Sequence, residues 1–337
     1  MSSTQAAAIL GCRGPRLTPD ERDFFAAAQP WGFILFARNC ETPDQVRRLT
    51  GCLRAAVGRD APILIDQEGG RVQRIGPPQW RQYLPPLDQC RAAGAQAPRA
   101  MYLRTRLIAA ELADLGIDVN CAPMADIAGP DTHAFLKNRC YGTDAESVTA
   151  NACAVAEALF DGGLLPVIKH MPGHGRAVVD SHTTPPVVED AAETLRARDF
   201  APFKALADLP MAMTAHVVYT AFDPAVPATT SPRMIRLIRD ELGFSGLLMT
   251  DDISMDALAG DLAARCRAAR AAGCDLVLHC NGDLSEMRVA VDTAGTLQGD
   301  GLARAEAALA ARRPVRPIDI AATEAELEAL ISGRVHG

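Results

Sequence analysis

The chain has 337 residues, of which 48% are hydrophobic and 22% are charged, and its formal net charge is −7. These proportions are those of an ordinary globular protein with enough apolar residues for a large core. The net negative charge argues against nucleic acid or an anionic membrane as the main partner, and no stretch approaches the roughly 20 consecutive apolar residues of a membrane helix.

Eight short apolar runs recur along the chain and have the character of buried strands. They lack a strict alternation of apolar and polar residues, which is typical of parallel strands covered on both faces. The intervals between most of them have the length of a strand plus a helix. The eight runs span residues 6–12, 32–38, 61–67, 117–124, 165–170, 210–216, 246–252 and 274–280.

Helical patterns with marked ends separate these runs. Thr42-Pro43 opens one helix, and Gly273 closes another directly before a strand. Alternating strands and helices predict an α/β fold, a single-domain (β/α)8 barrel over residues 1–337, with irregular first strands. A C-terminal helix is expected at about 322–333. A doubly wound sheet is the rival, but "GCRGPR" after the first strand is not a dinucleotide-binding motif.

Polar residues end most of the predicted strands. Any one of them could simply cap the following helix, but six strands show the same feature. Because the carboxyl ends of barrel strands meet at one mouth, where active sites lie, the pattern predicts a polar pocket. The residues are Asp66, Asp126, Lys169 with His170, His216, Asp251 with Asp252, and His279.

A metal site is one interpretation of the histidines, but the spacing does not favour it. The chain has neither a His-x-His strand nor an HExxH helix. His170 and His174 are four residues apart, yet Pro172 and Gly173 between them prevent a helix from presenting both. We therefore expect no metal and no cofactor. The segment "DQEGGRVQR" reads as a tight turn that presents an arginine, Arg71 or Arg74, to an anionic or hydroxyl-rich ligand.

Acid/base catalysis is the remaining interpretation of the histidine-rich segment 169–182. Asp180 and His182 are two residues apart in a stretch without helical pattern, so both side chains can lie on one side of an extended backbone. A carboxylate beside an imidazole fixes its tautomer and raises its pKa, which suits a proton donor near neutral pH. An ordinary loop contact is the alternative.

Four motifs in this order resemble glycoside hydrolase family 3, in particular its single-domain bacterial β-N-acetylglucosaminidases. They are "LIDQEGGRVQR" (64–74), "KHMPGHG" (169–175), "DSH" (180–182) and "MTDDISM" (249–255). The resemblance implies a retaining exo-enzyme that removes terminal β-linked N-acetylglucosamine from cell-wall muropeptides during peptidoglycan recycling. The expected substrate is N-acetylglucosaminyl-anhydromuramic acid, with or without peptide.

The resemblance also assigns roles to residues of this chain. Asp251 would be the nucleophile that forms a covalent glycosyl-enzyme. His182 would be the acid/base, assisted by Asp180. The sugar contacts would be Asp66, Arg74, Arg139, Lys169 and His170. Arg139, in "NRCYG", is the loosest motif match, and no role follows for His216; His279 is expected to be a core histidine.

Other functions stay open at this point. A β-glucosidase of the same family would usually carry a second domain, whereas a phosphorylase is compatible with a histidine acid/base because histidine does not repel phosphate. A metal-dependent barrel hydrolase would need bound zinc, and a non-catalytic sugar-binding protein would be expected to lack Asp251 or His182.

Cellular location is predicted from the start of the chain and from its cysteines. The first residues lack the basic start and apolar core of a signal peptide. The ten cysteines are spread evenly and form no CxxC pair, as expected for small core residues in the reducing cytoplasm. The expected partner is a small carbohydrate, with a monomer favoured.

Overall fold

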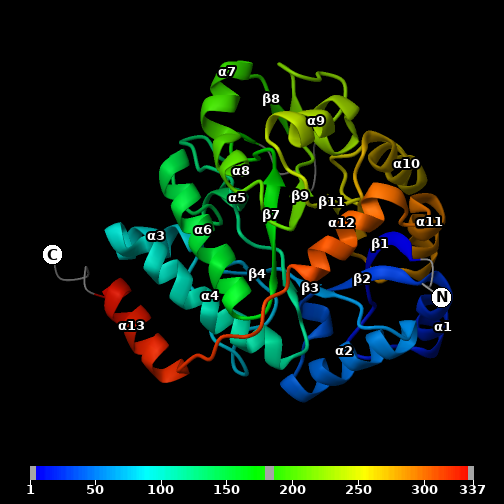
Figure 1. Ribbon diagram of the computed structural model, residues 1–337, viewed down its shortest axis with the longest axis horizontal. Coiled ribbons are helices and arrows are strands. Elements are labelled where there is room, and N and C mark those ends of the chain that lie inside the picture. The colour runs from blue at the N-terminus through cyan, green and yellow to red at the C-terminus, as the bar shows by residue number, and fades with distance from the viewer. Residues whose placement is uncertain (1–4, 179–185, 333–337) are drawn as a thin grey trace.

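Eight parallel strands close into a barrel at the centre of the computed structural model, which describes residues 5–178 and 186–332 (Figure 1). The order around the barrel is β1-β12-β11-β9-β7-β6-β3-β2. Each strand overlaps one of the eight predicted apolar runs, so the predicted barrel is confirmed. The strands are β1 (Ala6–Gly11), β2 (Pro30–Leu35), β3 (Ile63–Ile65), β6 (Val119–Asn120), β7 (Leu165–Met171), β9 (Met211–Thr214), β11 (Leu247–Asp252) and β12 (Leu276–His279).

Two small strand pairs lie outside the barrel. The hairpin of β4 (Gln67–Gly69) and β5 (Val72–Gln73) directly follows β3, and β8 (Val187–Val188) pairs in parallel with β10 (Val218–Tyr219).

Helices surround the barrel (Figure 1). No helix in residues 5–178 or 186–332 is long and apolar enough to cross a membrane. The helices are α1 (Pro19–Ala28), α2 (Pro43–Val57), α3 (Pro86–Ala93), α4 (Ala97–Asp114), α5 (Ala134–Lys137), α6 (Ala145–Asp161), α7 (Ala192–Thr194), α8 (Ala201–Ala205), α9 (Pro232–Arg236), α10 (Leu262–Ala272), α11 (Leu284–Ala294), α12 (Gly299–Ala310) and α13 (Ile320–Ser332).

The helix ends follow local sequence signals. Thr18 and Glu21 form a capping box at the start of α1, and Thr42 caps α2 by accepting from the backbone N–H of Gln45. Gly273 ends α10 with φ of 115°, a conformation that side-chain-bearing residues rarely adopt. The predicted ends of α2 and α10 are therefore confirmed.

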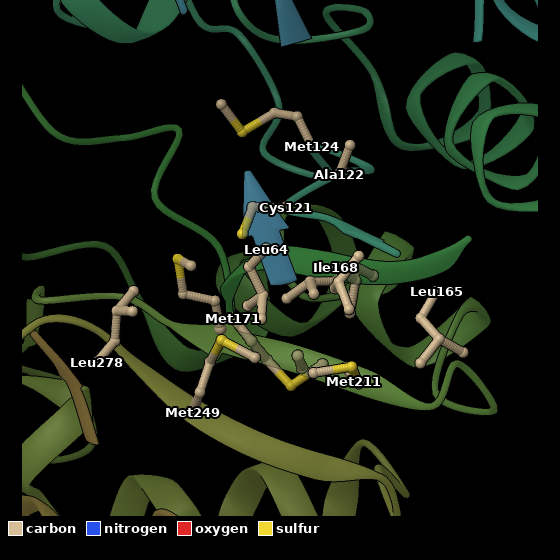
Figure 2. Close-up of a cluster of buried hydrophobic side chains, with 14 of the residues drawn as sticks. Leu64, Cys121, Ala122, Met124, Leu165, Ile168, Met171, Met211, Met249 and Leu278 are labelled. Carbon is tan, nitrogen blue, oxygen red and sulfur yellow. The ribbon is translucent and has the colours of Figure 1, made fainter. Parts of the chain in front are cut away.

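The barrel interior is packed with side chains rather than hollow. Every residue of β7 is buried. Figure 2 shows Met171, Met211 and Met249, from three adjacent strands, among Leu64 and Leu278. Flexible methionines fill irregular gaps between branched residues, so the floor of the barrel mouth rests on a filled apolar core.

The two ends of the chain show smaller features. The pairing of β1 with β2 shifts register between Ala6 and Ile9, which is the irregularity expected in the first strands. Helix α13 begins two residues before the expected range and packs against α3 and α4. All ten cysteines lie in the described residues, and none forms a disulfide.

Candidate active site

A cavity of about 340 Å³ opens at the carboxyl ends of the barrel strands. This volume lies within the range of small-ligand sites. Six of the eight predicted site residues line it: Asp66, Arg74, Arg139, Lys169, His170 and Asp251. The chain folds β3, β7 and β11 so that residues more than a hundred positions apart converge on one pocket.

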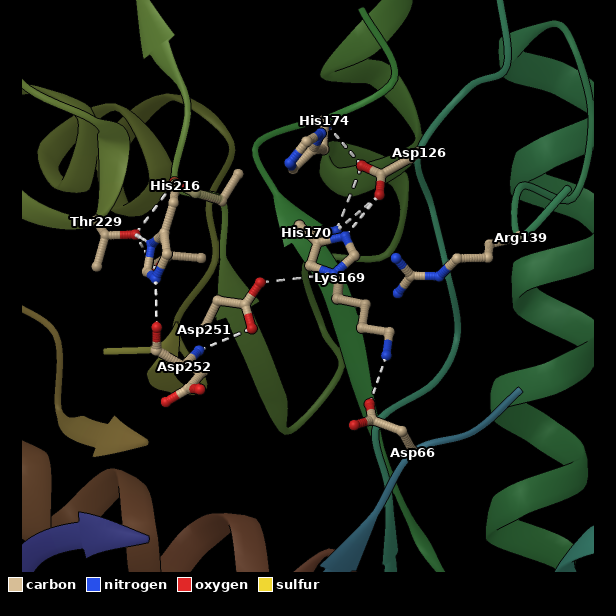
Figure 3. Close-up of polar contacts among 12 residues, drawn as sticks. Asp66, Asp126, Arg139, Lys169, His170, His174, His216, Thr229, Asp251 and Asp252 are labelled. Carbon is tan, nitrogen blue, oxygen red and sulfur yellow. Dashed lines mark hydrogen bonds and ion pairs between the residues drawn. The ribbon is translucent and has the colours of Figure 1, made fainter. Parts of the chain in front are cut away.

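One wall of the cavity is a network of paired charges, and Figure 3 shows its pair of Lys169 with Asp66. Lys169 Nζ lies 2.7 Å from Asp66 Oδ1 and 2.6 Å from Glu68 Oε1. The guanidinium of Arg139 donates two hydrogen bonds to Glu68, at 3.0 and 2.9 Å, and Arg74 Nη2 lies 3.2 Å from Asp66 Oδ2. Each buried charge therefore has an opposite partner, as burial requires.

The pairing keeps every member of this wall charged. Burial raises the pKa of Glu68, but the charges of Arg139 and Lys169 outweigh it and hold that pKa at about 2. The same balance of burial against Lys169 and Arg74 holds the pKa of Asp66 well below its usual range. Burial lowers the pKa of Lys169, yet Asp66 and Glu68 raise it above the ordinary value. Fixed donors and acceptors of this kind suit sugar hydroxyls.

Glu68 is a site residue that the sequence prediction missed. Its side chain is fully buried and bonds both Arg139 and Lys169. The available signal was the Asp-x-Glu spacing of Asp66 and Glu68, which the turn-like glycines Gly69 and Gly70 obscured. Arg139 is thereby placed in the pocket, although its motif match was the loosest.

Asp251 lies on β11, across the cavity from this wall (Figure 3). Its Oδ1 accepts from the backbone N–H of Asp252 at 2.8 Å, and its Oδ2 lies 3.9 Å from His170 Nε2. Burial raises its pKa, but the charge of His170, the Asp252 N–H and Lys169 bring that pKa below the ordinary value. Asp251 is therefore a carboxylate at neutral pH, as a nucleophile must be.

The neighbouring Asp252 has a different role. Its carboxylate accepts from Ser254 and from the backbone N–H of Cys280. It therefore fixes the loop that follows β11, and only Asp251 of the pair lines the cavity.

Asp126 orients the histidines of the segment that begins at β7. Its Oδ2 lies 2.8 Å from His170 Nδ1, and its Oδ1 accepts from the backbone N–H of His174 at 2.6 Å. Because a carboxylate only accepts, the Nδ1 of His170 carries the proton and Nε2 faces Asp251. Burial raises the pKa of Asp126, but the charge and hydrogen bond of His170 lower it below its usual value.

His174 and His216 are two further histidines near Asp251. His174 lines the cavity, is 5% exposed, and has no partner for its Nδ1 among the described residues. Burial lowers its pKa to about 4. His216 lies behind Asp251, bonded to Thr229 Oγ1 at 2.7 Å and to the carbonyl of Asp252 at 3.0 Å (Figure 3), and burial lowers its pKa as well.

His279 is a core residue, as expected, but it is only half satisfied. Its Nε2 lies 3.1 Å from Glu286 Oε2, whereas its Nδ1 has no partner within the described part of the chain. Its neighbours Leu278 and Cys280 face the cavity instead, because successive strand residues point to opposite sides.

The predicted acid/base pair, Asp180 and His182, lies outside the described residues. Arg176, which precedes residues 179–185 in the chain, pairs with Asp190 at 2.5 Å and with the buried Asp199 at 2.7 Å. Residues on both sides of 179–185 are thus joined at the edge of the cavity. Within the part of the chain that the structure describes, no group of three or more His, Cys, Asp or Glu side chains could hold a metal ion.

Comparison with known proteins identifies the family of this chain. A β-hexosaminidase from Stenotrophomonas maltophilia is 38% identical over 285 residues, covering 82% of this chain and 84% of its own. The native NagZ of Neisseria gonorrhoeae superposes with a TM-score of 0.82 at 29% identity, covering 98% of this chain and 96% of that one. The same protein in complex with N-trifluoroacetyl-D-glucosamine gives a TM-score of 0.79 at 28% identity, covering 98% and 99%. The model of the glycosyl hydrolase family 3 N-terminal domain matches residues 12–313, and the chain therefore belongs to glycoside hydrolase family 3.

Proposed function

We propose that this protein is a retaining exo-β-N-acetylglucosaminidase with Asp251 as its nucleophile. The observation that carries the proposal is the position of Asp251, an ionised carboxylate on β11 facing a wall of paired hydrogen-bonding groups on the opposite side of one cavity. The names of the relatives agree with the predicted enzyme class, a β-N-acetylhexosaminidase.

The proposed reaction has two displacements. An oxygen of Asp251 bonds to the anomeric carbon while the glycosidic C–O bond breaks. The leaving oxygen keeps the electron pair of that bond and receives a proton from His182. In the second step His182 removes a proton from water, whose oxygen bonds to the anomeric carbon and releases Asp251. Two inversions at one carbon retain its configuration.

The described residues position the sugar in this scheme. Asp66, Arg74, Arg139 and Lys169 would bond its hydroxyls. The Nε2 of His170 lies 3.9 Å from Asp251 Oδ2, so the imidazole would border the position of the reacting carbon and help to orient the sugar. Asp180 would orient His182.

For the natural substrate we propose N-acetylglucosaminyl-anhydromuramic acid, with or without peptide, in peptidoglycan recycling in the cytoplasm. The support is the motif resemblance together with the glucosamine derivative bound by the gonococcal relative. A neutral acetamido sugar would occupy the cavity floor, and the rest of the substrate would extend from the mouth.

The decisive test compares wild type, Asp251→Ala and Asp256→Asn on p-nitrophenyl β-N-acetylglucosaminide and β-glucoside, with and without chelator. Asp256 is exposed on the loop after β11 and serves as the control for removing a carboxylate. We expect chelator-insensitive activity on the acetamido sugar, a fall on the order of 10³-fold or more in kcat for Asp251→Ala, and little change for Asp256→Asn. Full activity of Asp251→Ala, or loss of activity with chelator, would contradict the proposal.

A second experiment tests the covalent step directly. A ring-fluorinated glycosyl fluoride of N-acetylglucosamine slows breakdown of the intermediate more than its formation. Mass spectrometry should then find the added sugar on the peptide that contains Asp251. An unlabelled peptide, or an initial product with inverted configuration, would rule out Asp251 as a covalent nucleophile.

A further inference from the structure

One cation at the mouth of the cavity differs from the others. Arg74, Arg139 and Lys169 are each paired with a carboxylate of the wall. Arg71 also lines the cavity, but it is exposed and forms no ion pair within residues 5–178 and 186–332. Its charge and its five N–H donors are therefore available to a ligand.

The backbone holds Arg71 in a fixed place. It lies between β4 and β5, at the tip of a hairpin whose turn residues Gly69 and Gly70 have φ of 101° and 61°. The backbone N–H of Gly70 donates to the carbonyl of Tyr83 at 2.9 Å, and Arg104 donates to the carbonyl of Glu68. A Cβ on Gly69 would lie 1.9 Å from Arg104 Nη2, so this turn is tightly packed from below.

An aromatic ring supports the guanidinium of Arg71. Its Cζ lies 4.1 Å from the centroid of the Phe135 ring, and the Cζ of Arg139 lies 5.3 Å from the same centroid. Phe135 and His133 also line the cavity. The Phe135 ring thus lies between Arg139, in the wall of paired charges, and Arg71, at the rim of the cavity. Its cation–π contact restricts the orientation of Arg71.

The position of the hairpin relative to Asp251 indicates which part of a substrate Arg71 would contact. In the closed strand order β1-β12-β11-β9-β7-β6-β3-β2, the strand before the hairpin, β3, lies diametrically opposite β11. In a displacement by Asp251, the leaving group departs on the side of the sugar away from the nucleophile. An exposed group on the opposite rim is therefore placed to meet the leaving group rather than the sugar being transferred.

We propose that Arg71, supported by Phe135, binds a carboxylate on the leaving group and so selects acidic aglycones. The inference rests on the proposed glycosidase function and adds a specificity residue to it. Arginine suits this task because its planar donors can bond both oxygens of a carboxylate. Asp66 and Glu68 neutralise the cations of the wall, so among the described residues that line the cavity Arg71 is the positive charge without an ion-pair partner.

The test uses two aryl N-acetylglucosaminides that differ in one charge, the 4-carboxyphenyl and the 4-carbamoylphenyl glycosides. The quantity measured is the ratio of their kcat/KM values, in wild type and in Arg71→Gln, Arg71→Lys and Arg267→Gln. Dividing the ratio of one protein by that of another cancels the different leaving abilities of the two phenols. Arg267 is exposed on α10 and outside the cavity, so it is the control for removing a surface charge.

We expect Arg71→Gln to lower the carboxylate preference by roughly two- to fivefold. Arg71→Lys should retain part of it, and Arg267→Gln should retain all of it. The preference of wild type should also weaken as salt is added, because the contact is exposed. Activity of Arg267→Gln on the neutral glycoside should stay within about twofold of wild type.

The outcomes separate this inference from the proposed function. An unchanged ratio in Arg71→Gln, with activity on both glycosides intact, overturns the role of Arg71 and leaves the glycosidase standing. An equal loss on both glycosides assigns Arg71 to general binding or folding and also overturns selection of acidic aglycones. A wild type without activity on either glycoside would remove the proposed function itself.

Discussion

The two sides of the active-site cavity stabilise their buried polar groups in different ways. The wall formed by Asp66, Glu68, Arg139 and Lys169 consists of permanently charged groups that neutralise one another. The side that carries Asp251 is instead surrounded by imidazoles, those of His170, His174 and His216. We call these two parts the charged wall and the histidine side.

The difference determines how each part responds to its surroundings. The charged wall titrates only at extreme pH, so its donors and acceptors stay in place under any working condition. On the histidine side, burial lowers the pKa of His174 to about 4 and also lowers the pKa of His216, so these two imidazoles are neutral at neutral pH. Paired fixed charges and neutral imidazoles thus lie on opposite sides of one cavity.

The largest effect is expected from breaking the charged wall at its most buried carboxylate. Glu68→Ala removes the partner of both Arg139 and Lys169 and leaves two buried cations short of a negative charge. Such changes cost about 3–5 kcal/mol. Denaturant unfolding at neutral pH should show this loss in the free energy of unfolding, and kcat/KM should fall with it.

The matched control for Glu68→Ala is Glu326→Ala. The pair of Arg99 with Glu326 has the same two-bond geometry, at 2.7 and 2.8 Å, but both side chains are about half exposed. We expect a cost of about 0–1 kcal/mol there. Equal losses in the two variants would show that burial does not distinguish the charged wall.

On the histidine side, the next largest effect should come from Asp126→Asn. The amide oxygen can still accept a backbone N–H, but it cannot accept from His170 Nδ1 and from both backbone groups as a carboxylate does. The imidazole would lose its fixed tautomer, and we expect kcat to fall on the order of 100-fold.

The unfolding free energy of Asp126→Asn should change far less than that of Glu68→Ala. A large loss of stability with unchanged activity per folded molecule would mean that Asp126 only supports the fold. The comparison therefore needs both readouts on the same preparation.

Stability falls as pH falls on both sides, but the pH window of the loss differs between them. His174 has a folded pKa of about 4, below the unfolded value of about 6.5. Between these pH values His174 is protonated in the unfolded chain but not in the native state. The free energy of unfolding therefore falls as pH falls from about 6.5 toward 4. Glu68, with a folded pKa of about 2, contributes stability that is present above about 4.3 and is lost only as pH falls below that.

The matching experiment measures the free energy of unfolding of wild type and His174→Gln at pH 8 and pH 5. At pH 8 both states are neutral at this position, so the difference reports packing alone. At pH 5 the linkage of one such histidine costs wild type about 2 kcal/mol, and the variant should lack this cost. An identical pH dependence in the two proteins would show that His174 takes up its proton normally in the folded state.

Features of the molecule that depend on local sequence patterns were predictable, whereas those that depend on contacts between distant residues were not. The strands are predictable because buried parallel strands are continuous apolar runs. Asp66, Lys169, His170 and Asp251 are predictable because polar side chains end those runs, whereas the role of Arg139 follows only from the family resemblance. Glu68 was missed because its burial depends on Arg139, 71 positions away, and nothing in the local pattern marks that pairing. The positions of His174 and His216 behind and beside Asp251 depend on the closure of the barrel, which no single segment encodes.

The smallest effect is expected from salt, and it follows from the burial of both sides. Buried pairs such as Lys169 with Asp66 and Glu68 are shielded from mobile ions, so screening that removes exposed attractions leaves them nearly intact. For a neutral aryl N-acetylglucosaminide, kcat/KM should change less than about twofold between about 0.05 and about 0.5 M salt. A steep salt dependence with this neutral substrate would mean that water and ions reach the charged wall, and that its rigidity does not come from buried pairing.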